Sequence, residues 1–355
     1  MSNHNLIIIY LFFFGSSIVF SILINKLFLK FSKTLGIRDK KDTIIRWGPQ
    51  SKPAFGGISF YIIFLFSIIA YYLIIKENYY LLNLKLIGII IACTLGFLMG
   101  LYDDAYNTNP LIKLSTQIVC GLILIFSGTY IHIFQSVPLN YAITLFWVIG
   151  IMNSVNMLDN MDAVTSIISI SIIVTILLNI FLQNDLTNFY LIILIGVLGS
   201  LIGFVPYNWN PSKIFMGDTG SQFLGIFLSI TGIIYLWNCK YVNSIASKQF
   251  IISVLVFMLP IIDTTVVVLK RIMRGKSPFV GGKDHTTHHL SYIGLSDKKV
   301  VYVIIAISLI SMFLTIVIIN YIPNWNLLYF ICFVLYILVI FAVLFYIANL
   351  NREKD

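Results

Sequence analysis

Charge is scarce in this 355-residue chain, because Asp, Glu, Lys and Arg together make up only 10% of it. Soluble domains typically contain about 25% charged residues. Hydrophobic residues make up 59% of the chain, and they gather in long runs instead of alternating with polar residues. This composition excludes a soluble globular protein, and the missing alternation excludes a membrane β-barrel.

Other common signatures are missing as well. The four cysteines, at positions 93, 120, 239 and 332, lie far apart and give neither a disulfide framework nor the spacing of a zinc site. No Walker pattern or dinucleotide fingerprint occurs. The first residues, MSNHN, lack the basic region of a cleaved signal peptide, so we expect the first apolar segment to be retained. No linker or internal repeat divides the chain, which indicates a single integral-membrane domain over residues 1–355.

The abundant feature is apolar segments near the length of about 20 residues with which a helix crosses a bilayer. Eleven such segments predict an all-α fold, a polytopic membrane protein with about eleven transmembrane helices. They cover residues 6–27, 55–75, 86–102, 111–131, 141–158, 163–182, 187–205, 222–238, 249–269, 300–320 and 326–348.

Lysine and arginine are divided unequally between the two sets of loops. The loops after the first, third, fifth, seventh and ninth segments, with the C-terminal tail, hold 19 of the 23, and only Lys76, Lys85, Lys240 and Lys248 lie opposite. Positive charge marks cytoplasmic loops. We therefore predict an external N-terminus, a cytoplasmic C-terminus and a place in the cytoplasmic (inner) membrane. Because 12 of the 14 acidic residues lie on or near the same side, we expect the chemistry to face the cytoplasm.

The largest polar interruption is residues 270–290, with five Lys or Arg, Lys283 among them, and three of the five histidines. His285, His288 and His289 are spaced i, i+3, i+4 and would share one helical face. A zinc site and plain loop packing both fit this spacing. The neighbouring cations favour a third interpretation, the binding of phosphate oxygens.

A second basic stretch, residues 26–52, carries eight cations and is explained by orientation and contact with anionic lipid headgroups. It leads into SKPAFGG, where Gly56 and Gly57 permit a close backbone approach. From there Lys52 could reach a phosphate.

Carboxylates gather at the ends of the apolar segments. Asp103 and Asp104 are adjacent at the end of the third segment, and Lys113 follows. Because a helix C-terminus disfavours anions, this pair is either solvated in a loop or functional, as a general base or a metal ligand. Further on, Asp218 lies between Gly217 and Gly220, with Lys213 and Phe215 just before it, so the backbone around this carboxylate can approach a ligand.

A polar stripe ends the fifth segment, where Asn153, Asn156, Asp159 and Asp162 follow at i, i+3 spacing. Helix capping and interhelical hydrogen bonds would explain it. Amide and carboxylate oxygens are also the ligands that Mg²⁺ prefers, and polar groups at membrane depth usually face a functional cavity.

These residues combine oxygen ligands for Mg²⁺ (or Mn²⁺) with donors for phosphates, and no Ser-His-Asp nucleophile or redox-cofactor motif accompanies them. The combination is typical of phosphoryl or glycosyl-phosphate transfer, in which positioning and charge stabilisation dominate. Eleven helices favour a lipid as one of the substrates.

Four motifs, GLYDD, NSVNMLDNMDA, GFVPYNWNPSKIFMGDTGS and RGKSPFVGGKDHTTHHL, lie in this order at segment ends. They resemble those of the polyprenyl-phosphate N-acetylhexosamine-1-phosphate transferases (glycosyltransferase family 4). The last motif is similar to that of the UDP-sugar branch, not to the adjacent histidines after a proline in the phospho-MurNAc-pentapeptide branch. The resemblance implies transfer of N-acetylhexosamine-1-phosphate from a UDP-sugar to undecaprenyl phosphate with release of UMP, the first membrane step of a cell-envelope polysaccharide. It implies a bilayer setting, allows a homodimer and suggests no nucleic acid partner.

The resemblance also implies residue roles. Asp218 and Asn156 would hold Mg²⁺, and Asp103 would deprotonate or position the lipid phosphate, supported by Asp104. Lys113 would meet phosphate. The other candidates would surround the nucleotide, pyrophosphate or sugar: Lys52, Asn153, Asp159, Asp162, Phe215, Lys283, His285, His288 and His289.

Three positions depart from the family pattern. Asn160 and Ala163 stand where the family has glycines, and Phe55 stands where it has an arginine. Two other functions are alternatives for a chain of this composition. A transporter of an anionic solute would place its polar residues near the bilayer midplane. An intramembrane aspartyl protease would need Gly-x-Gly-Asp, and here Phe215 occupies the first position.

Overall fold

Helices are the only regular elements in the part of the chain that the computed structural model describes, residues 3–32, 52–74, 83–186, 190–239, 245–277 and 282–350. A π-helical turn, η2 (Ile233–Trp237), continues α8. The α-helices are α1 (Asn3–Ser32), α2 (Gly56–Ile74), α3 (Leu84–Tyr106), α4 (Pro110–Phe126), α5 (Val137–Leu158), α6 (Val164–Leu182), α7 (Tyr190–Asn208), α8 (Gly217–Gly232), α9 (Ala246–Val256), α10 (Met258–Met273), α11 (Thr286–Tyr292), α12 (Asp297–Tyr321) and α13 (Leu327–Leu350).

The all-α polytopic fold expected from the sequence is confirmed. Nine helices within the described ranges are long and apolar enough to cross a membrane. The ninth apolar segment is not one straight helix, because α9 and α10 meet at a bend of 78°. Pro260 lies in the first turn of α10, where its missing N–H needs no helical partner. The fourth segment forms the shorter α4, of 17 residues, which ends at Phe126.

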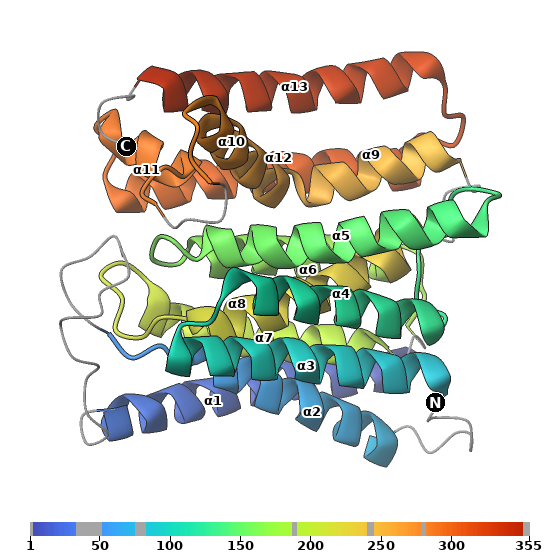
Figure 1. Ribbon diagram of the computed structural model, residues 1–355. Helices are drawn as coiled ribbons and strands as arrows, with labels where there is room; N and C mark the ends of the chain where they lie inside the picture. The colour runs from blue at the N-terminus through green and yellow to red at the C-terminus, as the bar shows by residue number, and fades with distance from the viewer. Residues whose placement is uncertain are drawn as a thin grey trace.

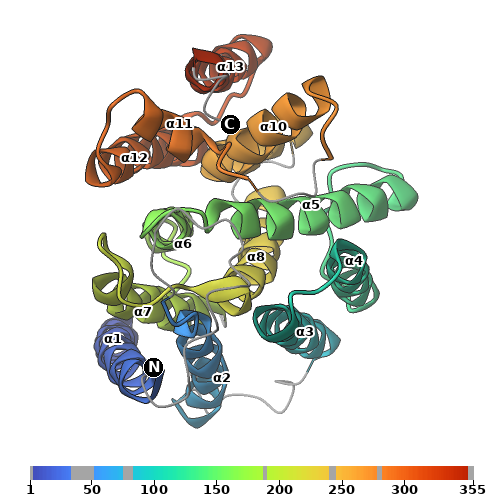
Figure 2. The same cartoon turned by 60° about the vertical axis from the view of Figure 1, so that its left-hand side comes forward.

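Helix α8 lies at the centre of the bundle, among α2, α3, α5, α6 and α7 (Figures 1 and 2). Within its apolar window 89% of the residues are buried, against 6% for α13 at the edge of the molecule. Since α8 begins with the Asp218 motif, that motif stands at one end of the most enclosed of these helices.

Glycines allow α2 and α3 to approach the first turn of α8. A Cβ added at Gly57 would lie 2.1 Å from the backbone N of Gly220, and one added at Gly100 would lie 2.1 Å from the carbonyl O of Asp218. Neither position has room for a side chain, because the obstacles are backbone atoms. The first turn of α8 is therefore held between two neighbouring helix backbones.

The start of α2 is also paired with the segment before α8. The N–H of Gly56 donates to the carbonyl of Phe215 (3.1 Å), that of Gly57 to Met216 (3.0 Å), and that of Phe215 to Pro53 (2.9 Å). These bonds satisfy backbone groups that would otherwise be unpaired at a helix start. They tie the SKPAFGG stretch to the Asp218 motif.

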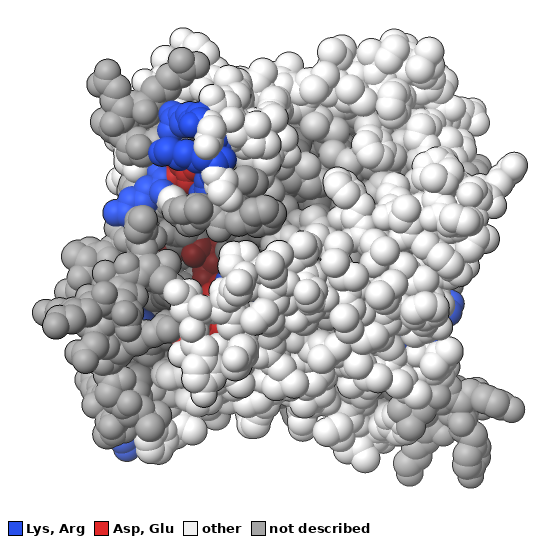
Figure 3. Space-filling view, in the orientation of Figure 1, with Lys and Arg blue, Asp and Glu red and all other residues white. Residues whose placement is uncertain are grey.

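Charged side chains gather at one end of the molecule, which we call the polar end. Helix α1 begins at the opposite end and α13 finishes at the polar end (Figure 1). In the space-filling view, Lys and Arg side chains cluster there over α10 and α11, and acidic side chains lie in a recess below them (Figure 3). Among the described cations, only Lys85 and Lys248 belong to helix starts at the opposite end.

The close packing at Gly57 leads to a stability prediction. Gly57→Ala should lower the apparent Tm in detergent by several degrees, because overpacking against backbone typically costs about 1–3 kcal/mol. Gly15→Ala in α1 is the matched control, since an added Cβ there meets nothing within 4 Å. An unchanged Tm for Gly57→Ala would contradict the described packing of α2 on α8.

Candidate active site

Lys113 lies between two carboxylates at the polar end. Its Nζ is 2.5 Å from Oδ2 of Asp103 and 3.9 Å from Oδ2 of Asp218. The other oxygen of Asp103 accepts from the backbone N–H and the hydroxyl of Thr108. The Asp103 side chain is only 2% exposed, whereas those of Lys113 and Asp218 are 24% and 27% exposed. A ligand can therefore reach Lys113 and Asp218 more readily than Asp103.

A short connection between α3 and α4 creates this arrangement. Asn107 ends α3 in the left-handed region, with φ of 51°, and Asn109 caps α4 by accepting from the N–H of Leu111. Pro110 then occupies the first turn of α4, where proline is well tolerated. The tight reversal turns α4 back beside α3, so that Lys113 on the first turn of α4 meets Asp103 on the last turn of α3.

The carboxylate of Asp104 binds the first turn of α8. It accepts from the backbone N–H of Asp218 (3.0 Å) and from both the N–H (2.8 Å) and the hydroxyl (2.7 Å) of Thr219. A carboxylate here is favourable because the first N–H groups of a helix lack intrahelical partners and carry partial positive charge. Gly217, with φ of +75°, makes the close fit possible, since an added Cβ would lie 2.6 Å from Asp104 Oδ2.

Asn156 and Asn153, one turn apart on α5, have different partners. The Asn156 amide nitrogen lies 2.5 Å from Asp218 Oδ1 and 2.8 Å from Ser221 Oγ. Asn153 exchanges two amide hydrogen bonds with Gln117 of α4. The structure thus brings Asn156 to the acidic cluster and uses Asn153 to join two helices.

The expected polar stripe does not extend beyond α5, because the helix ends at Leu158. Asp159 is the capping position, and Asp162 lies in the turn that follows. Asp162 accepts from the backbone N–H (2.9 Å) and the hydroxyl (2.7 Å) of Ser212. It therefore holds the loop before α8 and does not continue a helical face toward the cluster.

Ala163 takes the left-handed conformation for which glycine is favoured. Its φ is 65°, and its N–H donates to the side-chain oxygen of Asn208. Alanine is strained there, so the departure from the glycine that the motif resemblance implies is tolerated but not favourable. Asn160, at the other replaced glycine, accepts a hydrogen bond from Thr287 through its side chain.

Lys52 and Phe215 lie together at the edge of the site. Lys52 donates to Ser212 Oγ (3.0 Å), and its ammonium lies 5.1 Å from the centre of the Phe215 ring. Cation–π contact of this kind is weakly stabilising. Together with the backbone pairing of Phe215, it positions the loop that ends at Asp218.

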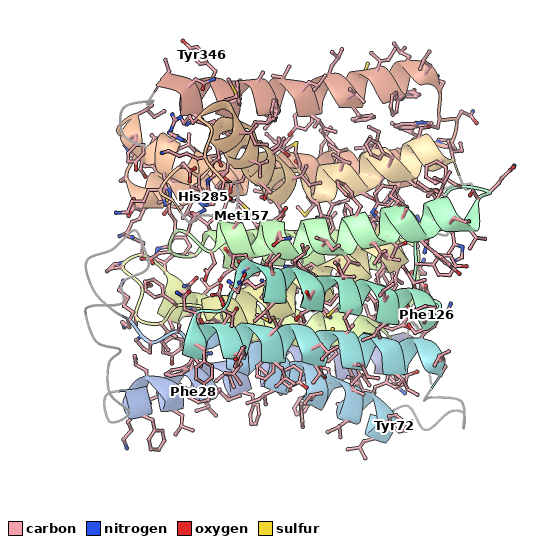
Figure 4. All side chains as sticks on the ribbon, in the orientation of Figure 1. Phe28, Tyr72, Phe126, Met157, His285 and Tyr346 are labelled. Carbon is pink, nitrogen blue, oxygen red and sulfur yellow. The ribbon has the colours of Figure 1, made fainter. Side chains whose placement is uncertain are left out.

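Helix α11 is shorter than the histidine spacing suggested, since it begins at Thr286 and leaves His285 at its cap. Asp263 of α10 anchors this point. It accepts from His285 Nδ1 (2.8 Å) and from the N–H (2.8 Å) and hydroxyl (2.6 Å) of Thr286. Because a carboxylate accepts from Nδ1, the proton is fixed on that nitrogen, and Nε2 is the acceptor nitrogen of the neutral ring. His285 and Met157 of α5 both lie toward the polar end of the molecule in Figure 4.

The other two histidines are enclosed. Burial, together with the neighbouring His285, lowers the pKa of His288 to about 3, so its ring is neutral at physiological pH. His289 is fully buried, and its Nε2 lies 2.8 Å from Nζ of Lys270, which also donates to the carbonyl of Ala348 in α13. Lys270 of α10, bonded to both His289 and Ala348, therefore joins α10, α11 and α13.

Asp284 pairs with Arg271 through two hydrogen bonds of 2.7 Å. Burial alone would raise the pKa of Asp284, but the bonds and charge of Arg271 outweigh it and hold that pKa below its usual value. The pair fixes the chain just before His285. Lys283 lies beside it, and its carbonyl accepts from the Tyr292 hydroxyl (3.2 Å).

The sequence motifs indicate no role for Asp263, Arg271 or Thr108. Asp263 did carry a signal, because an acid inside an apolar segment usually has a functional or structural partner. Arg271 belongs to a basic stretch in which no spacing distinguishes it from its neighbours. Thr108 could not be found from the sequence, since its contact with Asp103 depends on the shape of the turn.

Asp218 and Asn156 are the best candidates for holding a metal ion. Within the described ranges, no three His, Cys, Asp or Glu side chains converge as a ready-made metal site. Mg²⁺ commonly uses one or two protein oxygens and takes the rest from water and substrate phosphates. An accessible carboxylate beside an amide fits that requirement, whereas a structural zinc site would need four protein ligands.

The described residues therefore form an acidic cluster with one cation at the start of α8, and a histidine-bearing segment at the same end. The model of glycosyl transferase family 4 matches residues 86–236, which include the cluster. A phospho-N-acetylmuramoyl-pentapeptide-transferase of Staphylococcus aureus is 32% identical over 297 residues, 74% of this chain and 86% of that protein.

Two further relatives have names from the other branch. A probable undecaprenyl-phosphate N-acetylglucosaminyl 1-phosphate transferase of Bacillus subtilis is 28% identical over 76% of this chain and 75% of its own length. A decaprenyl-phosphate N-acetylglucosaminephosphotransferase of Mycolicibacterium smegmatis is 26% identical over 72% and 69%.

The contacts of Asp104 generate a prediction for this site. Asp104→Ala should lower the apparent Tm, because hydrogen bonds to a charged group contribute about 1.5–3 kcal/mol. Asp185→Ala, which removes a carboxylate from the opposite end of the bundle, should change it much less. Equal effects of the two substitutions, measured by thermal unfolding in detergent, would contradict the anchoring of α8 by Asp104.

Proposed function

The chain belongs to glycosyl transferase family 4, and on this premise we propose that it transfers N-acetylhexosamine-1-phosphate from a UDP-sugar to undecaprenyl phosphate. The family and the named relatives make it a phosphosugar transferase. The proposed products are undecaprenyl-diphosphate-N-acetylhexosamine and UMP. Relatives of both branches match, so transfer from a pentapeptide-bearing donor is the alternative, and the activity assay has to distinguish the two donors.

The proposed reaction is a displacement at phosphorus. A phosphate oxygen of the lipid attacks the β-phosphorus of the UDP-sugar, the bond from that phosphorus to the bridging oxygen breaks, and UMP leaves with the bridging oxygen. A phosphate monoester has a second pKa near 6, so most of the acceptor is already a dianion at neutral pH. Deprotonation of the acceptor phosphate therefore contributes less to catalysis than alignment of the two anionic substrates.

The observation that carries the proposal is the pair of accessible, oppositely charged groups on Lys113 and Asp218, 3.9 Å apart. Lys113 would bind a phosphate oxygen, and Asp218 with Asn156 would hold Mg²⁺ or Mn²⁺. Such a metal neutralises pyrophosphate charge during phosphoryl transfer. The oxygen and nitrogen of an amide are assigned from its hydrogen bonds. Rotating the Asn156 amide by 180° therefore supplies the oxygen that a shared cation requires.

Asp103 and Asp104 have separate proposed roles. Buried Asp103 contacts Lys113 directly and would hold the ammonium aimed at the acceptor phosphate. Asp104 would position Asp218 by fixing the first turn of α8. The role of Asp104 does not require it to touch a substrate.

The histidine-bearing segment would bind the donor. His285 is oriented by Asp263. The neutral ring of His288 has one nitrogen that donates a hydrogen bond and one that accepts. Lys283, Asp159 and Phe215 lie at the same end and would contact the nucleotide or sugar. His289, Asn153 and Asp162 act through the elements that they hold in place.

The polar end would face the cytoplasm. Positive charge marks the cytoplasmic side of membrane proteins, and most of the described cations lie at this end. Nucleotide sugars are charged and water-soluble, so a site open to the cytoplasm would receive the donor directly. The acceptor would enter from the bilayer. A homodimer stays a prediction.

The function is tested with purified chain in detergent or nanodiscs, undecaprenyl phosphate and radiolabelled UDP-N-acetylhexosamines. We expect a lipid-extractable labelled product and UMP in equal amounts, loss of both with EDTA, and recovery with Mg²⁺. A reaction without undecaprenyl phosphate is the control. Product from UDP-MurNAc-pentapeptide alone would assign the other branch. Accumulation of solute in vesicles without chemical turnover would contradict a transferase.

A further inference from the structure

The candidate site is assembled from two groups of helices. The acids and Lys113 lie on α3, α4, α5 and α8, whereas the histidines lie on α11. Helix α11 is tied to α10 through Asp263 and, through His289 and Lys270, to α13. Those ties hold α11 within its own group, which packs on α5 through α10 and on α6 through α12, and none of these hydrogen bonds reaches the acidic cluster.

Asn160 links the two groups directly. Its side-chain oxygen accepts from the hydroxyl of Thr287 on α11 (2.8 Å), and its side-chain nitrogen donates to the carbonyl of Met157 at the end of α5 (3.0 Å). Thr287 is fully buried, and the backbone of Asn160 interacts with the His288 ring. We call the Asn160–Thr287 hydrogen bond the clasp.

A second connection is longer and made of weaker bonds. Ser291 of α11 donates to Asp297 (3.3 Å), and Asn210 donates to both Asp297 (3.2 Å) and Asp162 (3.3 Å). Distances above 3.2 Å are near the limit for such bonds. The clasp is a single, shorter bond between fully buried Thr287 and half-buried Asn160, so it constrains α11 more tightly.

We infer that the clasp sets the position of His285 and His288 relative to Asp159, and that Asn160 is thereby a positioning residue for the nucleotide-sugar donor. The inference rests on the proposed function, because it assumes that the donor lies between these residues. The acidic cluster has anchors of its own, in Thr108 and in the contacts of Asp104 with α8. Loss of the clasp should therefore weaken donor binding and leave the acceptor side unchanged.

The test is a double-mutant cycle on steady-state kinetics. Asn160→Ala and Thr287→Val each remove one partner of the clasp and keep the backbone. Each should raise the KM for the UDP-sugar about fivefold, the effect of losing about 1 kcal/mol. The kcat and the KM for undecaprenyl phosphate should stay within about twofold. The double variant should show about the same fivefold increase, not the product of the two, because both substitutions break one bond.

Gln183→Ala is the matched control, since it removes a side-chain hydrogen bond of 2.6 Å to Asn320 between α6 and α12, far from the site. It should lower Tm without changing the KM for the donor. If the clasp were only structural, Asn160→Ala and Thr287→Val would behave like Gln183→Ala. They would reduce the amount of active enzyme and leave the KM for the donor unchanged. That outcome, or independent effects that multiply in the double variant, would overturn the inference.

Binding of UDP separates this inference from the proposed function. If UDP and Mg²⁺ fail to raise the Tm of the wild-type chain, the proposed donor site itself is contradicted. If UDP stabilises the wild-type chain and both single variants equally at every concentration, only the role of the clasp is contradicted. We expect wild-type stabilisation with half-effect concentrations about fivefold higher in both variants.

Discussion

Three carboxylates meet at the start of α8, and their mutual repulsion has to be offset before this end of the bundle can form. Lys113 neutralises Asp103 and lies close to Asp218, while Asp104 takes the unpaired N–H groups of the helix start. Charges of one sign this close together are tolerated only with such partners. Because α8 is also the most enclosed helix, the electrostatic arrangement and the packing of the whole bundle depend on the same turn.

That turn explains why glycines surround it. The backbone of α3 has to come within van der Waals distance of α8 for Asp104 to reach its N–H groups, and Gly100 leaves room for this approach. Gly57 allows the same close approach of α2 from another side. The central bundle thus presents a rigid acidic face. Helices α10–α13 present the histidine-bearing segment from the other side, joined to the bundle by few polar contacts. A rigid acidic face and a separately held histidine-bearing segment would suit the proposed reaction, in which a soluble and a lipid substrate must be aligned.

Much of this organisation could be predicted from the sequence, because hydrophobic runs of fixed length dictate membrane helices. Asp103, Asp104, Asp218, Asn156 and Lys113 stood at segment ends, and the structure brings them together. The individual partners could not be predicted. An i, i+3 series does not reveal that α5 stops at Leu158, or that Asn153 turns toward Gln117. The break between α9 and α10 and the anchoring of His285 by Asp263 likewise depend on contacts between segments distant in the chain.

In the proposed reaction the Asp218 carboxylate holds a divalent cation, and the transfer requires that cation. The most direct measurement is the transfer rate of Asp218→Asn across a Mg²⁺ titration, alongside its thermal stability. Asparagine keeps the shape and the contact with Asn156 but removes the charge, so we expect a correctly folded chain whose activity falls at least about a hundredfold and is not restored at high Mg²⁺. Near-normal turnover of that variant with ordinary dependence on Mg²⁺ would contradict the account.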